Sequence, residues 1–197
     1  MKAELRRALV EAEQALAGDA RGHLGLGHRQ AVWAALGSRQ ARARLAVLAA
    51  RHVLPHWERV RPGDRLPHRL LELAEAVLRG EVEGAALAAE RNQAVTDLDD
   101  ASTLSTDKMS VAAGYAAHHA LTAAIRDEAF DPAHLDPGAR DEVVEPGDHD
   151  SGFLASIAAA AGAPWHEGSS AERRRTFWRW WLSEAVVRAS ESSPPAT

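Results

Sequence analysis

Alanine dominates this sequence, and the apolar residues recur at helical intervals. Alanine is the best helix former, whereas the β-branched and aromatic residues that favour strands are scarce. No stretch alternates apolar and polar residues in the way that predicts a strand. The sequence therefore predicts an all-α protein, a single compact multi-helix bundle of about eight helices over residues 1–190, with a disordered tail at 191–197.

Glycine, proline and capping residues divide the chain into the expected helices. These helices span residues 2–17, about 28–36, a stretch capped by Ser38, about 67–79, about 82–99, about 107–128 after a Ser105 or Thr106 cap, about 151–161, and a last one that a Ser169–Glu172 capping box opens and that runs to about 189. Pro55 lies within the third pattern and is expected to kink that helix or end it a turn early. The sixth helix is rich in alanine and glycine, so we expect it to be central, with close neighbours.

Composition excludes several classes of protein. There is no cysteine, so disulfides and thiolate zinc sites are impossible. The charged first 20 residues do not form a signal peptide, and no stretch approaches 18 uncharged apolar residues, so we expect a cytoplasmic protein without membrane spans. The net charge is −5 and no basic face is evident, which disfavours nucleic-acid binding.

The acidic charge is concentrated in one place. Residues 127–150 carry nine acids against one base, Arg140, which leaves the rest of the chain slightly positive. Proline and glycine interrupt residues 129–150, which indicates a long acidic loop before the last two helices, and loops of this length are typically functional or disordered. One interpretation is that the loop steers a basic partner onto the protein. We therefore predict a partner-binding set made up of Asp131, Asp136, Asp141, Glu142, Glu145, Asp148, Asp150 and Trp180.

The same loop has two other interpretations. Asp148-His149-Asp150, with acids upstream, could bind a hard cation through oxygen ligands, although the spacing fits no EF-hand loop. The loop could also be a solvated acidic surface without a ligand.

Ten histidines make a metal site worth considering. His52 and His56 lie one helical turn apart, the spacing by which a helix offers two metal ligands. A third ligand could come from His23, His28, His118 or His119, which gives a helical metal-dependent hydrolase as the alternative function. Against it, His52 is not followed by the glutamate of a metalloprotease motif, and Pro55 disturbs the turn between the two histidines.

No other catalytic constellation is evident, so we expect neither an enzyme nor a bound cofactor. The stretch LGLGHR (residues 24–29) looks like a phosphate-binding loop only superficially, because no strand precedes it. Three of the six tryptophans lie in FWRWWL, where Trp178 and Trp181 share a predicted buried stripe. Trp180 falls on the flank of that stripe, and an exposed tryptophan there would suit a partner or homodimer surface.

Four segments, in this order, resemble the Imm5-type immunity proteins of bacterial polymorphic toxin systems. They are LGLGHRQAVWAALG, with Leu26, Gly27, Arg29, Trp33, Leu36 and Gly37; RLAVLAARHVLPHWE, with Leu54, Pro55, Trp57 and Glu58; AAGYAAHHAL, with Gly114 and Tyr115; and RRRTFWRWWLSEAV, with Phe177, Trp178, Trp181, Leu182, Glu184 and Ala185. The resemblance covers residues from about 20 to 190.

The resemblance implies an all-helical protein that is encoded beside a toxin, binds it and neutralises it in the producing cell. The implied partner is a cognate toxin domain, held in a stoichiometric protein–protein complex, and no catalytic residue is implied. We interpret Gly27 and Gly37 as helix punctuation and Trp33, Trp57 and Trp178 as core.

Overall fold

The computed structural model describes residues 1–125, 130 and 135–191. Its helices are α1 (Ala3–Gly18), α2 (Leu26–Leu36), α3 (Arg39–Val60), α4 (Leu66–Leu78), α5 (Ala88–Leu104), α6 (Lys108–Ile125), α7 (Ser151–Ala160), α8 (Ala171–Trp180) and α9 (Val186–Glu191). A π-helical turn, Trp181–Ala185, joins α8 to α9 without a break, so the described residues form eight separate α-helical rods and no strand. The predicted all-α fold is confirmed.

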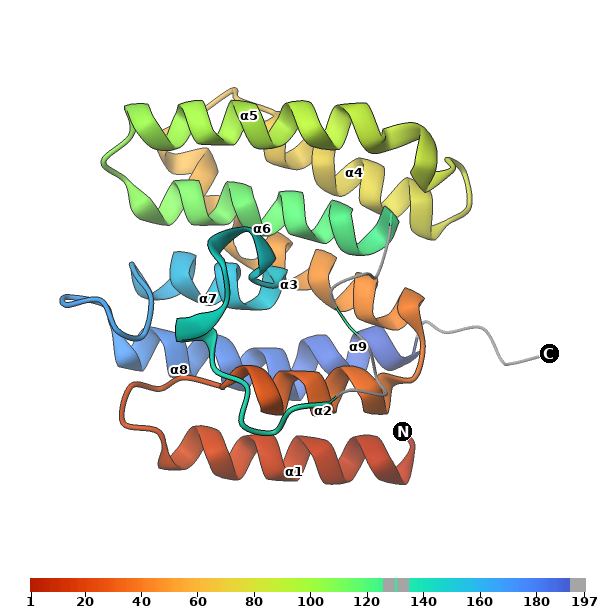
Figure 1. Cartoon of the computed structure of the whole chain (residues 1–197), viewed down its shortest axis with the longest axis vertical. Coiled ribbons are helices and arrows are strands. Elements are labelled where there is room, and N and C mark those ends of the chain that lie inside the picture. The colour runs from red at the N-terminus through yellow and green to blue at the C-terminus, as the bar shows by residue number, and fades with distance from the viewer. Residues whose placement is uncertain (126–129, 131–134, 192–197) are drawn as a thin grey trace.

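Helix α6 lies at the centre of the bundle, as predicted. It packs against α3, α4, α5 and α7, while α3 also reaches α9. Figure 1 shows α4, α5 and α6 at one end of the molecule and α1 and α2 at the other, with α3, α7 and the last helix between them. The segment 135–150 crosses in front of α2 and α7.

Small residues allow the close packing around α6. Gly114 faces Trp57 of α3 and Leu98 of α5, and a Cβ at Gly114 would lie 2.8 Å from Cζ3 of Trp57 and 2.6 Å from Cδ2 of Leu98. Trp57 and Leu98 are fully buried. No side chain larger than hydrogen therefore fits at Gly114 without displacing the tryptophan ring.

Local chemistry sets most helix ends. Ser38 caps α3 by accepting a hydrogen bond from the Ala41 N–H (3.1 Å), and Gly37 ends α2 in the left-handed region at φ 74°, both as predicted. The start of the last helix was predicted one residue early, because Ser170 is the residue whose side chain accepts from the Arg173 N–H. Likewise Asp107, which accepts from the Met109 N–H (3.1 Å), caps α6 in place of Ser105 or Thr106.

The prediction that Pro55 could end α3 a turn early is wrong. The helix continues to Val60 with Pro55 inside it and exposed. On either side of it, Val53, Leu54 and Trp57 are buried in the core. Their burial offsets the backbone hydrogen bond that proline cannot donate.

The tryptophans of the last helix form part of the core. Trp178 and Trp181 are 0% and 1% exposed, and their rings meet edge to face at 5.5 Å. Trp57 is also buried, whereas Trp33 is only partly buried against the core.

The last helix includes Glu191, and the rest of the predicted tail, 192–197, lies outside the described residues. No helix of the described chain has the length and apolarity that crossing a membrane requires.

Replacing Gly114 by valine should destabilise the fold by about 2 kcal/mol, because overpacking a tight core forces side chains and backbone to shift. Urea unfolding of purified protein measures this change. Gly18→Val is the matched control, since nothing lies within 4 Å of a Cβ at Gly18, the last residue of α1. Equal stability of the two variants would contradict the close packing at Gly114.

Candidate protein-binding site

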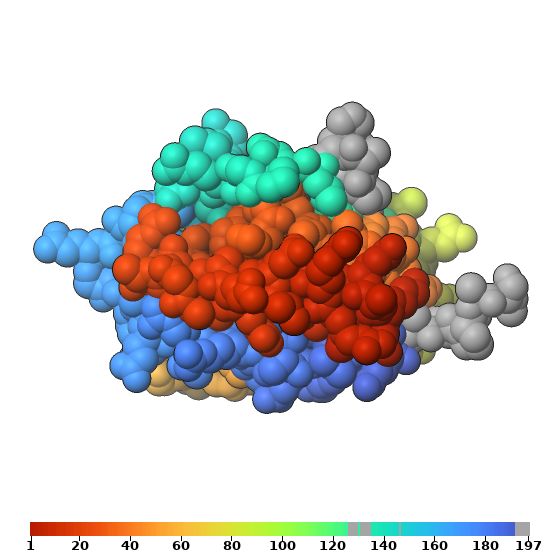
Figure 2. All heavy atoms as spheres, turned by 90° about the horizontal axis from the view of Figure 1, so that it is seen from below, coloured from red at the N-terminus to blue at the C-terminus, as the bar shows by residue number. Residues whose placement is uncertain are grey.

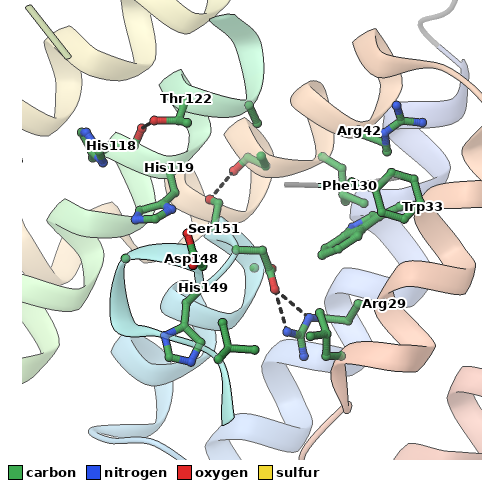
Figure 3. Close-up of a pocket in the computed structure, with 18 of the residues that line it drawn as sticks. Arg29, Trp33, Arg42, His118, His119, Thr122, Phe130, Asp148, His149 and Ser151 are labelled. Carbon is green, nitrogen blue, oxygen red and sulfur yellow. Dashed lines mark hydrogen bonds and ion pairs between the residues drawn. The ribbon is translucent and has the colours of Figure 1, made fainter. Parts of the chain in front are cut away.

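A fully buried arginine anchors the acidic segment. Arg29 of α2 is 0% exposed and reaches two aspartates of the segment. Its Nη1 and Nη2 donate to the two carboxylate oxygens of Asp141 (3.0 and 2.5 Å). Its Nε and Nη2 donate to Oδ2 of Asp150 (3.0 and 2.6 Å), and these two bonds are the dashed lines at Arg29 in Figure 3. Nη1 also donates to the Leu24 carbonyl (2.7 Å), so every N–H direction of the guanidinium is used.

Helix α2 places Arg29 in the interior because the arginine shares its buried face with Val32 and Leu36. The guanidinium lies 5.5 Å from the ring centroids of both Phe153 and Trp178, a distance at which a cation is attracted to an aromatic face. Aromatic contact and paired carboxylates together offset part of the cost of taking this charge out of water.

Further contacts hold the segment around Asp141. This carboxylate is only 2% exposed, and its Oδ2 lies 2.9 Å from Nε2 of His23. Nε2 of His149 lies 3.1 Å from the Asp141 backbone carbonyl. Asp150 in turn caps α7 by accepting from the Phe153 N–H (2.9 Å). Arg29, His23 and Asp141, all buried, and half-buried Asp150 form the Arg29 cluster, which ties the segment to α2 and to α7.

Glycine 27 permits a backbone contact between α2 and the segment. A Cβ at Gly27 would lie 2.5 Å from the carbonyl oxygen of Pro137. Gly27 lies inside the first turn of α2, so its predicted role as helix punctuation is wrong, and Gly25 is the N-cap. Close approach of the acidic segment is the physical reason for glycine at this position.

The electrostatics of the Arg29 cluster follow from burial and pairing. Burial alone would raise the pKa of Asp141, but the Arg29 charge and the hydrogen bonds from His23 and Arg29 outweigh it and hold that pKa well below its usual range. For Arg29, burial lowers the pKa, but the charges of Asp150 and Asp141 raise it above its ordinary value. Arg29 and Asp141 are therefore both ionised in the folded protein at neutral pH.

The outer side of the segment carries exposed charge together with one apolar side chain. Asp136, Glu145 and Asp148 are exposed, and Val143 is 79% exposed. Figure 2 shows the segment standing out from one face of the molecule, beside the N-terminal helices and away from the last helix. Carboxylates around an exposed apolar residue are what a basic protein surface with an apolar contact point would match.

The structure places the residues of the predicted partner-binding set in different surroundings. Asp136, Glu145 and Asp148 are exposed, and Glu142 pairs with Arg21 (3.0 Å) at the surface. Asp141 is buried and Asp150 is half-buried, both as ion-pair partners of Arg29. Asp131 lies outside the described residues.

Trp180, the last member of the set, lies apart from the segment. It is partly buried against the core, and its ring stacks on His52 with the ring centroids 3.7 Å apart. Contact of these residues with a partner stays a prediction.

Three of the histidines proposed as metal ligands have other partners. His52 stacks on Trp180, His23 bonds Asp141, and Nε2 of His118 lies 3.2 Å from the Arg91 carbonyl. Within the described part of the chain, no three histidine, aspartate or glutamate side chains are grouped so as to hold a metal ion. Nothing in the structure supports the hydrolase alternative or the cation site at Asp148–Asp150.

Sequence reasoning missed Arg29 and His23 as site residues. A signal for Arg29 was present, because Arg29, Val32 and Leu36 recur at helical spacing and a charge within an apolar stripe needs a buried counter-charge. The acidic loop is the part of the sequence most able to supply that counter-charge. His23 had no comparable signal, since only the folded chain brings it to Asp141, 118 residues away.

The fold and the site define an all-helical protein whose acidic segment is fixed on its surface by a buried arginine. A family model described as Immunity protein Imm5 matches residues 10–188. The chain therefore belongs to the Imm5 immunity protein family. No curated protein matches it.

Replacing Asp141 by asparagine should destabilise the protein by about 3 kcal/mol, because removing one partner of a buried ion pair leaves charge without compensation. Urea unfolding compares this variant with Asp136→Asn, which removes the same charge from the same segment. Asp136 is exposed, and an asparagine oxygen can keep its hydrogen bond to the Gly138 N–H, so the control should change stability by no more than about 0.5 kcal/mol. Equal effects would show that the Arg29 cluster does not stabilise the fold.

The contribution of Asp141 to the free energy of unfolding should depend on pH. A carboxyl with a depressed native pKa contributes stability that is fully present above its unfolded value, about 4, and is lost as the pH falls through the native value. The free-energy difference between the natural protein and Asp141→Asn should thus be constant from pH 7 to about 5 and shrink below about 4. Urea unfolding at a series of pH values measures it, and a difference that stays constant down to pH 3 would contradict the assignment.

Proposed function

We propose that this protein neutralises a cognate bacterial toxin by forming a stoichiometric complex with it, without breaking bonds itself, and that it does so in the cytoplasm of the producing cell. Membership of the Imm5 immunity protein family supports a toxin-directed role. The observation that carries the mechanism is the Arg29 cluster, which fixes an acidic segment on the surface of a folded helical body. A preorganised surface binds more tightly than a mobile one, because less conformational entropy is lost on association.

The acidic segment is the surface that we assign to the toxin, and a basic surface such as a nuclease groove is the matching partner. Asp136 and Glu145 would speed the encounter, while Val143 would supply apolar contact once the complex has formed. Buried Asp141 and half-buried Asp150 would act indirectly by holding the segment in place. Trp180 lies apart from the segment and belongs to a second surface that could serve a homodimer.

We expect a neighbouring gene to encode the partner, a large protein with a toxin-like C-terminal domain. Co-expression should protect cells from that domain, and the purified proteins should form a 1:1 complex. Survival with no complex, or a complex that leaves the toxin active, would exclude neutralisation by binding.

Removing charge from the outer side of the segment should slow association with that toxin domain. The double variant Asp136→Asn, Glu145→Lys raises the net charge as much as the control Glu11→Lys, Glu13→Gln, whose positions are exposed on α1. At low salt the segment variant should associate roughly tenfold more slowly than the control, and the gap should narrow at high salt. Stopped-flow or surface-resonance kinetics measure the rates, and equal rates would place the docking surface elsewhere.

A further inference from the structure

A cavity of about 700 Å³ lies beside the Arg29 cluster. Helices α2, α3, α5, α6 and α7 and the acidic segment all contribute to its wall. Figure 3 shows His119, Asp148 and Ser151 on one side of it, Trp33, Phe130 and Arg42 on the other, and Arg29 below. Its volume is in the range of sites that bury a small ligand or a short piece of chain.

The buried side-chain polar atoms of the wall that lack a hydrogen-bond partner are acceptors. The side-chain carboxylate of Asp148 has no hydrogen bond or ion pair within the described part of the chain. Nε2 of His118 bonds a carbonyl and must carry the proton, so Nδ1 is an acceptor, and it has no partner although His118 is only 8% exposed. Oε1 of Gln30 is likewise buried without a partner.

The cationic groups in the wall are engaged already. Arg29 is saturated by two carboxylates and a carbonyl. Arg42 lies 4.8 Å from the centroid of the Phe130 ring, on the side away from Asp148, and Arg91 donates to Oδ1 of Asn92. Burial, with the neighbouring His118 and His149, lowers the pKa of His119 to about 3, so its imidazole is neutral at physiological pH. A cation that enters near Asp148 therefore meets a carboxylate and uncharged acceptors.

We propose that this cavity receives an arginine side chain from a loop of the toxin, with the guanidinium donating to Asp148 and to the imidazoles of α6. A guanidinium supplies several donors and no acceptor, which matches the surplus of acceptors in the wall, and its flat face suits the aromatic side chains that also line the cavity. The proposal rests on the proposed function, because it names the toxin group that the site would recognise. It also separates two roles within one acidic segment: Glu145 and Asp136 for attraction, Asp148 for retention.

The first test uses a small probe and needs no toxin. N-acetyl-L-arginine amide is titrated into the intact protein and followed by NMR, with N-acetyl-L-glutamate amide as the probe of opposite charge. The arginine probe should shift the resonances of His119, Asp148 and Ser151 in a saturable way. Asp148→Asn should weaken its binding roughly tenfold, as expected when a charge-assisted hydrogen bond is lost.

Glu13→Gln is the matched control, because it removes the same charge from an exposed position on α1 outside the cavity. It should bind the arginine probe as the natural protein does. Equal binding by the two variants, or no saturable shift, would overturn the proposal. Binding of the glutamate probe alone would also overturn it, because it would indicate an anion site at Arg42 and Arg91.

The second test distinguishes this proposal from the proposed function. In a complex with the neighbouring toxin domain, Asp148→Asn should raise the dissociation rate roughly tenfold, and Glu13→Gln should leave it unchanged. A stable complex whose dissociation is the same in both variants would overturn the cavity proposal and leave neutralisation intact. Absence of any complex would overturn both.

Discussion

The buried charge of Arg29 is the constraint on which the surface of this protein depends. An unpaired guanidinium in the interior would cost several kcal/mol, so the fold must bring carboxylates to it. The two that reach it, Asp141 and Asp150, are 112 and 121 residues away along the chain. Satisfying one residue of α2 therefore fixes the position of a distant segment with little regular secondary structure, and that segment carries the acidic side chains exposed on this face.

The two aspartates of the segment that pair with Arg29 have different physical tasks. Asp150 pairs with Arg29 and also caps α7, so the last residue of the segment determines where a core helix begins. Asp141 has no helix to cap and is held by Arg29 and His23. Between these two aspartates the chain turns outward, and Val143 and Glu145 are exposed to solvent. Ion pairs at these two aspartates hold the loop in one position on the surface, although its composition alone suggests disorder.

Sequence periodicity was sufficient to predict the helices, because the position of each helix is determined largely by local chemistry. The small residues of α6, the Ser38 cap and the left-handed Gly37 all act over a few residues, and their predicted roles are confirmed. The errors arose where tertiary contact overrides local preference. Packing of Val53, Leu54 and Trp57 carries α3 through Pro55, and contact with Pro137 explains Gly27 better than any role at a helix end.

The site was harder to predict for the same reason. The acids of a Pro- and Gly-interrupted stretch look alike in a sequence, but folding divides those that the structure describes into ion-pair partners of Arg29 and exposed charges. Asp141 is buried and Asp136 is exposed because only Asp141 lies next to Arg29. The spacing of residues in the sequence carries no information on that distance. A charge count thus overestimates how much of such a segment is free to meet a partner. Prediction of the binding residues is more reliable when it begins with the buried charges. A charged residue within an apolar helical stripe requires counter-charges from elsewhere in the chain. The acidic residues that are not used as its counter-charges are the ones available to bind a partner.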